Sequence, residues 1–350
     1  MKLLVSALEH SANVHLHSLK KELSDDVEFI GIFDSDLGNS IVDLRSLAIM
    51  GFVDALKKLR YFFKLNAQMV DLAEEADKVL LIDSSGFNLP LAKKIKKRYP
   101  QKEIIYYILP QAWAWKKKRI PILEKTINHL ASILPFEQDY YSKNAPIIYV
   151  GHPLLDIIKE FKQELNTKVK EVAFMPGSRK GEIKKLMPVF EELIVKLKLN
   201  ATIIIPKHFT KEEIKELYGN LTGFKIAHDA HKTLYEADFA FICSGTATLE
   251  AALIGTPFVL SYIAKPLDYF IVSRLVKLSH IGLSNIMFTQ FNDKDLHPEF
   301  IQEDVTADNL LKAFNEYDRS TFLDDSKHLR AYLKHGSSKT VAKIITIGRT

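Results

Sequence analysis

The sequence has little cysteine and no long apolar segment. Cys243 is the only cysteine among 350 residues, so no disulfide can form within the chain, and a reducing compartment fits. No apolar run approaches the length that spans a bilayer. The apolar start of the chain is cut by Glu9 and His10, which favours a first β-strand over a signal peptide. The sequence therefore predicts a cytoplasmic protein without a membrane-spanning helix.

A strong charge of one sign is also missing. The chain has 48 lysines and arginines against 43 aspartates and glutamates, a net charge of +5. This mild excess fits an anionic substrate or an anionic membrane surface and does not require a nucleic acid. Trp113 and Trp115 precede the basic run 116–119, a pattern that RNA-binding surfaces also use. Aromatic residues at alternate positions more often pack a loop, so we expect no nucleic-acid partner.

What the sequence does have is an alternation of short apolar strands with helical patterns, in two successive series. Such a series is typical of a parallel sheet with helices on both faces. The sequence therefore predicts an α/β fold of two Rossmann-like, doubly wound domains, residues 1–160 and 161–350, with an interdomain cleft. The predicted strands are 2–7, 27–33, 79–82, 103–109, 129–134 and 147–150, then 171–175, 202–206, 223–227, 239–242 and 257–262.

Three helical predictions concern the domain borders and one helix start. The charged stretch 157–170 is predicted as a helix near the link between the domains. A helix is expected to open at Asn88-Leu89-Pro90, because proline suits a first helical turn. The stretch 321–347 looks helical and could fold back over the first domain.

A small-residue turn, Ser244-Gly245-Thr246, stands between a buried strand and a helix. Backbone N–H groups and the positive helix end meet at such a turn, which suits a diphosphate. Glu250 follows Thr246 by four residues, so it can face the same ligand and hold a ribose diol. The alternative is an ordinary helix start with a Ser or Thr cap.

A second turn of this kind, Pro176-Gly177-Ser178-Arg179, follows the first strand of the second series. The forked donors of an arginine match a phosphate, so Ser178 and Arg179 are candidate phosphate-binding residues together with Gly177. The alternative is a simple turn with a solvated arginine. Two phosphate-compatible loops in one domain favour the binding site.

Asp83 stands directly after the strand 79–82, in the first domain. A carboxylate at the carboxyl end of a parallel strand is placed to act as a general base. The alternative is an aspartate that caps a turn.

The stretch 51–65 is predicted as an amphipathic helix. Aromatic and aliphatic residues share one broad face, and basic residues flank it, a pattern typical of an interfacial anchor on anionic lipid. The alternative is a helix that only packs on its own sheet. The residues expected to face the membrane are Phe52, Leu56, Lys57, Lys58, Phe62 and Phe63.

These features occur together with Trp113-Ala114-Trp115, Leu134-Pro135-Phe136-Glu137 and Gly151-His152-Pro153 in one order. In this respect the chain resembles the lipid-A-disaccharide synthases, bacterial glycosyltransferases of the two-domain GT-B type. The resemblance implies transfer of 2,3-diacylglucosamine from UDP-2,3-diacylglucosamine to 2,3-diacylglucosamine 1-phosphate. The products are the β-1,6-linked lipid A disaccharide 1-phosphate and UDP, with inversion at the anomeric carbon.

The resemblance also assigns roles. Asp83 is the expected catalytic base, and Arg179, the turn Ser244-Gly245-Thr246, Glu250 and Asn285 are expected to bind UDP. No cofactor or metal is expected, because Asp34-Ser35-Asp36 lies in the other domain from the UDP loops. The family further suggests peripheral association with the inner membrane and a homodimer with exchanged C-terminal segments.

The chain departs from the family pattern at two places. Glu9-His10-Ser11-Ala12-Asn13 stands where the family has Glu-Ala-Ser-Gly-Asp, which leaves the acceptor-loop role of Glu9, Ser11 and Asn13 open. Gly86 stands where a second aspartate is usual, so Asp83 is the sole base candidate in its loop. Alternative functions are a peptidoglycan N-acetylglucosaminyltransferase, a UDP-sugar epimerase and a non-catalytic lipid- or nucleotide-binding protein.

Overall fold

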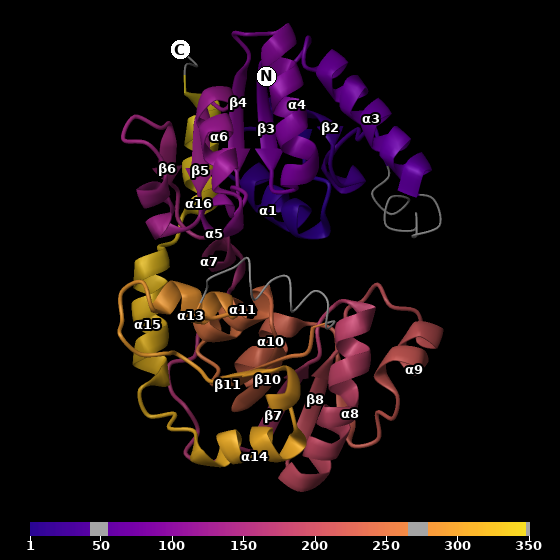
Figure 1. Cartoon of the computed structure of the whole chain (residues 1–350), viewed down its shortest axis with the longest axis vertical. Helices are drawn as coiled ribbons and strands as arrows, with labels where there is room; N and C mark the ends of the chain where they lie inside the picture. The colour runs from indigo at the N-terminus through magenta and orange to yellow at the C-terminus, as the bar shows by residue number, and fades with distance from the viewer. Residues whose placement is uncertain (43–54, 265–278, 348–350) are drawn as a thin grey trace. The chain divides into compact units, whose positions relative to one another are not determined.

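The computed structural model describes residues 1–42, 55–264 and 279–347 (Figure 1). The chain forms two compact units: Met1–Ile157 with Leu333–Thr350, and Ile158–Tyr332. Each unit contains one six-stranded sheet, and every strand pair described in the two sheets is parallel. The predicted fold class, two Rossmann-like α/β domains, is confirmed.

The sheet of the first unit has the strand order β2-β1-β3-β4-β5-β6. Its residues alternate between two cores: Val79 and Leu81 of β3 face one layer of helices, and Leu80 and Ile82 face the other. Helices α3 (Ala55–Leu72), α4 (Ser85–Arg98) and α6 (Ile120–Thr126) cover the first face, while α1 (His10–Lys20) and α16 (Ser337–Thr346) cover the second. The strands are β1 (Lys2–Ser6), β2 (Glu28–Ile32), β3 (Lys78–Ile82), β4 (Glu103–Tyr107), β5 (His129–Ser132) and β6 (Ile147–Tyr149).

The sheet of the second unit has the order β12-β11-β10-β7-β8-β9. Phe174 and Phe241 stack in its core with centroids 5.3 Å apart, and Phe190 of α8 packs against Phe174. Helices α8 (Lys180–Leu197), α9 (Lys211–Tyr218) and α14 (Ala307–Glu316) pack on this side, and α10 (Ala230–Glu236) and α11 (Thr246–Ile254) also contact the strands. The strands are β7 (Glu171–Met175), β8 (Asn200–Ile204), β9 (Phe224–Ala227), β10 (Phe239–Cys243), β11 (Phe258–Tyr262) and β12 (Glu299–Ile301).

Shorter elements complete both units. The remaining helices are α5 (Ala112–Trp115), α7 (Pro153–Ile157), α13 (Leu283–Phe288) and α15 (Phe322–Leu333), and the 3₁₀ turns are η1 (Ser35–Leu37), η3 (Lys117–Arg119), η4 (Pro135–Tyr140) and η5 (Gln302–Asp304). All the predicted strands form, with small shifts at their ends. The strand β12 was not predicted, because its three residues carry no apolar run.

The predicted helix over 157–170 is wrong. The helix α7 ends at Ile157, and the chain beyond it is irregular as far as β7. Here the backbone bonds to other elements: Lys162 N donates to Ile254 O at 2.8 Å, and Lys170 N donates to the Asp238 carboxylate at 2.7 Å. These bonds replace the internal ladder that a helix would need.

Two other helical predictions are corrected in detail. The helix α4 begins at Ser85, so Pro90 lies within it rather than in its first turn. The C-terminal stretch is two helices, divided at Gly336, whose φ of +91° favours glycine. The second of them, α16, packs on α1 and α7 and belongs to the first unit, so this part of the stretch 321–347 folds back over the first domain, as the sequence indicated that it could (Figure 1). The first of them, α15, lies in the second unit as far as Tyr332.

Candidate active site

Each sheet has one point where its strand order reverses. In the first unit the chain passes from β1 outward to β2 and then returns to β3 on the other side of β1. In the second unit β7 is flanked in the same way by β8 and β10. In each sheet the loops after the two strands that flank the reversal, β1 and β3 or β7 and β10, lead to opposite faces of the sheet. In such folds a crevice forms between these loops at the carboxyl edge, and ligands bind there. The turns that carry Glu9, Asp83, Arg179 and Ser244 are these loops.

The turn after β3 holds two non-glycine residues in the left-handed region. Asp83 has φ +50° and Ser84 has φ +42°, a conformation that costs about 1–3 kcal/mol per residue. The Asp83 carbonyl oxygen accepts hydrogen bonds from Tyr106 Oη at 2.7 Å and Asn88 Nδ2 at 2.9 Å. Asn88 is itself buried and accepts from Ser6 Oγ at 2.6 Å. Three strands and α4 thus hold the backbone of Asp83 in place.

The Asp83 carboxyl group is half-buried, and burial raises its pKa. The negative charge of Glu9 raises this pKa further, while a hydrogen bond from the Ser84 backbone opposes the rise. Ser84 Oγ also donates to Glu9 Oε1 at 3.3 Å, so the loops after β1 and β3 meet. A carboxylate with a raised pKa is a better proton acceptor near neutral pH.

The three residues predicted for the acceptor loop have different surroundings. Glu9 precedes α1 and is exposed beside the Asp83 turn, and Ser11 is exposed in the first turn of α1. Asn13 is buried: its amide donates to Ala7 O and Glu9 O at 2.9 Å, and its oxygen accepts from Asp34 N at 2.7 Å. Asn13 therefore anchors the loop rather than facing a ligand.

Two family motifs pack together beside β5. The Trp113 ring meets the Phe136 ring edge-on, with centroids 4.9 Å apart. The neighbouring Glu137 is 1% exposed, and its Oε2 is 2.5 Å from Ser132 Oγ. Burial raises the pKa of Glu137 to about 7. Among the described residues Glu137 Oε1 has no hydrogen-bond partner, and with this pKa a large share of the carboxyl groups stays protonated near neutral pH.

The two turns of the second unit adjoin each other. Gly177 has φ +102°, and a Cβ there would lie 2.8 Å from Glu182 Oε2 and 3.2 Å from Cys243 Sγ. Only glycine fits such a position. Gly245 has φ +152°, and α11 begins directly after it. Nothing lies within 4 Å of the position that a Cβ would take at Gly245, so the backbone of that turn is open to close approach by a ligand.

The polar side chains of these turns are accessible. Arg179 is 79% exposed and pairs with Glu182, at 2.8 Å, in the first turn of α8. That pair is the main cause that raises the Arg179 pKa, so the guanidinium is charged. Ser178 and Thr246 are exposed, and Ser244 Oγ donates to Ile281 O at 3.2 Å. Glu250 lies one turn into α11 and is 17% exposed.

Asn285 has no hydrogen-bonding capacity left for a nucleotide. It is fully buried, and its amide donates to His297 O and Glu299 Oε1, both at 2.9 Å. Its oxygen accepts from Leu296 N and His297 N. Its side chain ties α13 to the segment before β12, so any effect on UDP binding has to pass through the position of that helix.

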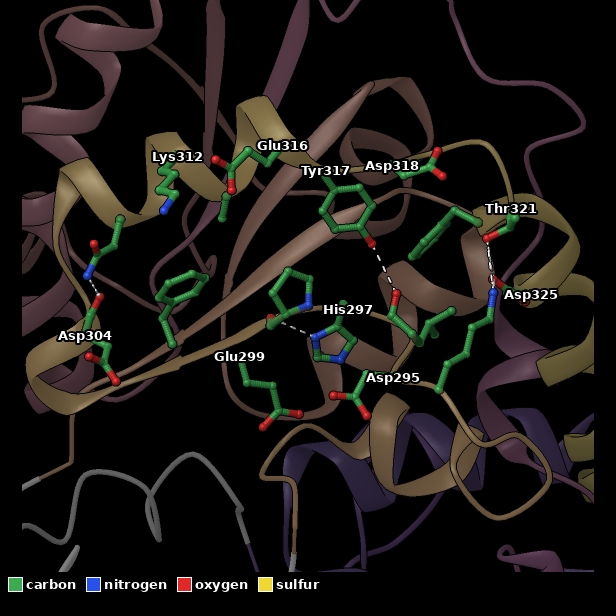
Figure 2. Close-up of a pocket in the computed structure, with 17 residues that line it drawn as sticks. Asp295, His297, Glu299, Asp304, Lys312, Glu316, Tyr317, Asp318, Thr321 and Asp325 are labelled. Atoms are coloured by element: carbon green, nitrogen blue, oxygen red, sulfur yellow. Dashed lines mark hydrogen bonds and ion pairs between the residues drawn. The ribbon is translucent and has the colours of Figure 1, made fainter.

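A cavity of about 880 Å³ lies elsewhere on the second unit, between α14, the start of α15 and the segment that leads into β12 (Figure 2). Tyr317 Oη donates to Leu296 O across it, and Lys294 pairs with Asp325 at 2.7 Å. None of the predicted UDP-binding residues lines it. Acidic residues outnumber basic ones among its lining side chains, which disfavours a diphosphate. The acidic residues are Asp295, Glu299, Asp304, Glu316, Asp318 and Asp325.

Within residues 1–42, 55–264 and 279–347, no group of three or more histidine, cysteine, aspartate or glutamate side chains is arranged to hold a metal ion. Asp34 of the Asp-Ser-Asp motif lies 3.9 Å from His17 Nε2. No helix in the described part of the chain is long and apolar enough to cross a bilayer.

The fold matches that of known sugar-nucleotide enzymes. The calicheamicin glycosyltransferase superposes over 100% of this chain and 98% of its own, with a TM-score of 0.63 and 12% identity. MurG of Acinetobacter baumannii covers 99% of both chains, with a TM-score of 0.60 and 13% identity. The UDP-GlcNAc 2-epimerase of Methanocaldococcus jannaschii covers 99% and 100%, with a TM-score of 0.59 and 13% identity. The chain therefore has the two-domain GT-B fold, which transferases and epimerases share.

Sequence comparison shows to which family of this fold class the chain belongs. The profile of the lipid-A-disaccharide synthetase family matches residues 3–343. The lipid-A-disaccharide synthase of Helicobacter pylori is 50% identical over 97% of this chain and 96% of its own, and that of Campylobacter jejuni is 46% identical over 98% of both. The chain belongs to the lipid-A-disaccharide synthetase family, which confirms the predicted resemblance.

Proposed function

We propose that the chain joins two acylated glucosamine units, with UDP-2,3-diacylglucosamine as donor and 2,3-diacylglucosamine 1-phosphate as acceptor. Family membership makes it a glycosyltransferase of lipid A disaccharide synthesis. The acyl-sugar substrates, the inversion and the residue roles are the proposal. The observation that carries it is the Asp83 carboxyl group, which has a raised pKa and stands on a turn held by hydrogen bonds at the strand reversal of the first sheet.

The proposed step is a single displacement. Asp83 takes the proton from the acceptor 6-hydroxyl as that oxygen forms a bond to the anomeric carbon of the donor. The bond from the same carbon to UDP breaks, and UDP leaves with the electron pair, so the configuration inverts. Arg179 and the N-terminal end of α11 after Gly245 meet the charge that develops on the diphosphate.

No cofactor and no metal ion are part of this proposal. The protein groups around Gly177 and Gly245 supply donors and positive charge where a divalent cation would otherwise act. Activity is expected to persist in EDTA. Complete loss in EDTA, with recovery on addition of magnesium or manganese, would bring Asp34 and Asp36 back as candidate ligands.

We further propose that the chain works in the cytoplasm at the surface of the inner membrane, because both substrates carry acyl chains. Phe63 of α3 is 60% exposed with Lys94 Nζ 5.8 Å from its ring, which supports a lipid-facing role for this end of the helix. Phe62 instead packs on Phe87, with centroids 6.1 Å apart. Leu56, Lys57 and Lys58 belong to α3, but their side chains, like the whole of Phe52, lie outside the described residues.

A homodimer with exchanged C-terminal segments also remains a proposal. Val341 and Ile345 of α16 are fully buried in the first unit of their own chain. An exchange would require α16 of a second copy to fill the same place. Light scattering of the full chain, and of a variant shortened before Ser337, tests whether α16 determines the oligomeric state.

The test of the function is one assay with purified protein. UDP release and a tetraacyl disaccharide product are expected only when the acylated donor and the acylated acceptor 1-phosphate are both present. UDP-N-acetylglucosamine without acyl chains serves as the second donor. Its use with a peptidoglycan acceptor, or its 2-epimerisation without any acceptor, would support the alternative functions and contradict this one.

A further inference from the structure

We propose that His231 is a positioning residue for the ribose of the nucleotide, because it holds the Glu250 carboxylate in the orientation that receives the two ribose hydroxyls. The inference rests on the proposed ribose contact of Glu250. It adds a residue from α10 to a site otherwise built from the loops after β7 and β10.

The geometry places the two side chains at the edge where ligands bind. His231 stands in the first turn of α10, which follows β9, and Glu250 stands in α11, which follows β10. His231 Nε2 lies 3.5 Å from Glu250 Oε2, and the two side chains are 31% and 17% exposed. In the described part of the chain no hydrogen bond occupies Glu250 Oε1. One oxygen is therefore held by His231, and the carboxylate retains acceptor capacity for a diol.

The electrostatics support the same role. Glu250 raises the pKa of His231 through hydrogen bonding and charge, and Asp229 at the start of α10 adds to the rise, against an opposing effect of burial. These two carboxylates are the charged groups that act on His231 among the described residues. The imidazolium form attracts the Glu250 carboxylate, and a carboxylate only accepts hydrogen bonds, as two ribose hydroxyls require.

A purely structural role for the pair is the competing explanation. The contact between α10 and α11 has other anchors, since Thr256 Oγ1 donates to Leu234 O at 2.6 Å, and both residues are buried. Asp229 Oδ1 caps α10 through Lys232 N. An ion pair that stays partly exposed, with its nitrogen and oxygen 3.5 Å apart, adds little to stability beside such contacts. We therefore expect the His231→Gln variant to fold normally.

The test compares the dissociation constants of UDP and 2′-deoxy-UDP, because their ratio isolates the ribose contact and cancels the ionisation of the phosphates. Wild type is expected to bind UDP more tightly than 2′-deoxy-UDP. In His231→Gln the ratio of the two dissociation constants is expected to be roughly fivefold smaller. Lys232→Gln, which removes a neighbouring charge from the same helix, is the matched control and should keep the full ratio. The wild-type ratio should also fall as pH rises through the raised pKa of His231, whereas the His231→Gln ratio should stay flat.

The outcomes separate this inference from the function beneath it. If wild type and Glu250→Gln both bind the two nucleotides equally, Glu250 does not hold the ribose, and the proposed contact itself fails. If wild type prefers UDP, Glu250→Gln loses the preference and His231→Gln keeps all of it, the ribose contact stands and the positioning role of His231 is overturned. If His231→Gln unfolds, the pH dependence of the wild-type ratio decides: a flat ratio overturns the role.

Discussion

Each unit has a six-stranded parallel sheet with one strand reversal, but the carboxyl groups in the loops at the carboxyl edges of the two sheets have different surroundings. In the first unit, Asp83 and Glu137 have raised pKa values because they are buried, and no ion pair involves either of them among the described residues. In the second unit, Glu182 pairs with Arg179, and Glu250 pairs with His231. A parallel sheet with one strand reversal thus fits the proposed proton-accepting site in one unit and the proposed anion-binding site in the other, and the loop residues make the difference.

The backbone conformation of the candidate site turns also differs between the two units. The first unit forces Asp83 and Ser84 into the left-handed region and holds them there with Tyr106 and Asn88. The second unit uses Gly177 and Gly245, and nothing lies within 4 Å of the position that a Cβ would take at Gly245. A carboxylate on a rigid turn suits chemistry at a single atom, whereas an open backbone suits close contact with a diphosphate.

The largest expected effect comes from removal of the base. Asp83→Asn should lower turnover by at least ~10²-fold, because an amide cannot accept the proton of the acceptor hydroxyl. UDP affinity should not change, since the nucleotide loops belong to the second unit. Steady-state kinetics and calorimetric titration with UDP measure the two quantities.

The control for this variant is Asp36→Asn, which changes an exposed aspartate of the same unit. It should leave turnover unchanged. Near-normal turnover in Asp83→Asn would remove the carboxylate from the mechanism and, with it, the contrast between the two units.

A second prediction tests the buried acid Glu137. Its pKa is about 7 in the folded chain against 4.5 as the reference value, so the folded state binds its proton more tightly. The stability from this group is complete below pH 4.5 and is lost as pH rises from there to about 7. The loss is roughly 3 kcal/mol in the free energy of unfolding, from about 1.4 kcal/mol per pKa unit.

Urea unfolding between pH 5 and pH 8 measures this loss (~4 pH points suffice to trace it). Glu137→Gln cannot ionise and should lack this part of the pH dependence, whereas the exposed Glu22→Gln should behave like wild type. If wild type and Glu137→Gln change in parallel with pH, Glu137 is already ionised in the fold, and it lies in a more polar site than Asp83.

On the anion-binding side, Arg179→Lys should weaken UDP binding by about tenfold, which corresponds to ~1.4 kcal/mol. Lysine keeps the charge but cannot offer the forked pair of donors. The neighbouring Lys180 pairs with Glu213, so Lys180→Gln is a control for the loss of nearby charge. Equal UDP affinity in wild type and Arg179→Lys would make Arg179 a surface residue that serves only Glu182.

Much of this contrast could be predicted from the sequence. Alternating apolar strands gave the two sheets, and the rule that ligands bind beyond carboxyl ends pointed to Asp83, Arg179 and Ser244. The strand order then brought these turns to the two reversals. The local sequence pattern was sufficient for these residues, because the position of a residue that closely follows a buried strand is determined by that strand.

The rest depended on contacts between distant residues. Tyr106 and Asn88 support Asp83 from another strand and a helix, and no local pattern indicates that. Asn285 matched a family motif, yet its hydrogen bonds are all taken by residues around β12, a strand too short to predict. The irregular stretch after α7 has helix-forming residues, but bonds such as that of Lys170 N to Asp238 override their propensity.

The smallest expected effect concerns lipid, and it compares one helix from each unit. Phe63 of α3 and Val195 of α8 are both exposed apolar residues, at 60% and 72%. Only the α3 residue is proposed to meet a membrane. Lys64→Gln should weaken binding to phosphatidylglycerol vesicles by roughly fivefold, since a basic residue near such a surface contributes about 1 kcal/mol.

Phe63→Ser should weaken vesicle binding in the same direction, because its ring no longer enters the interface. Val195→Ser is the matched control and should bind vesicles like wild type, and all three variants should keep wild-type UDP affinity. Phe62 is left unchanged because its contact with Phe87 belongs to the core, and its loss would lower the stability of the fold as well as vesicle binding.

If neither Phe63→Ser nor Val195→Ser changes vesicle binding, α3 is only a sheet-packing helix, and lipid must reach the Asp83 loop by another surface. If both weaken binding alike, any exposed apolar residue suffices, and the two units do not differ in their relation to the membrane.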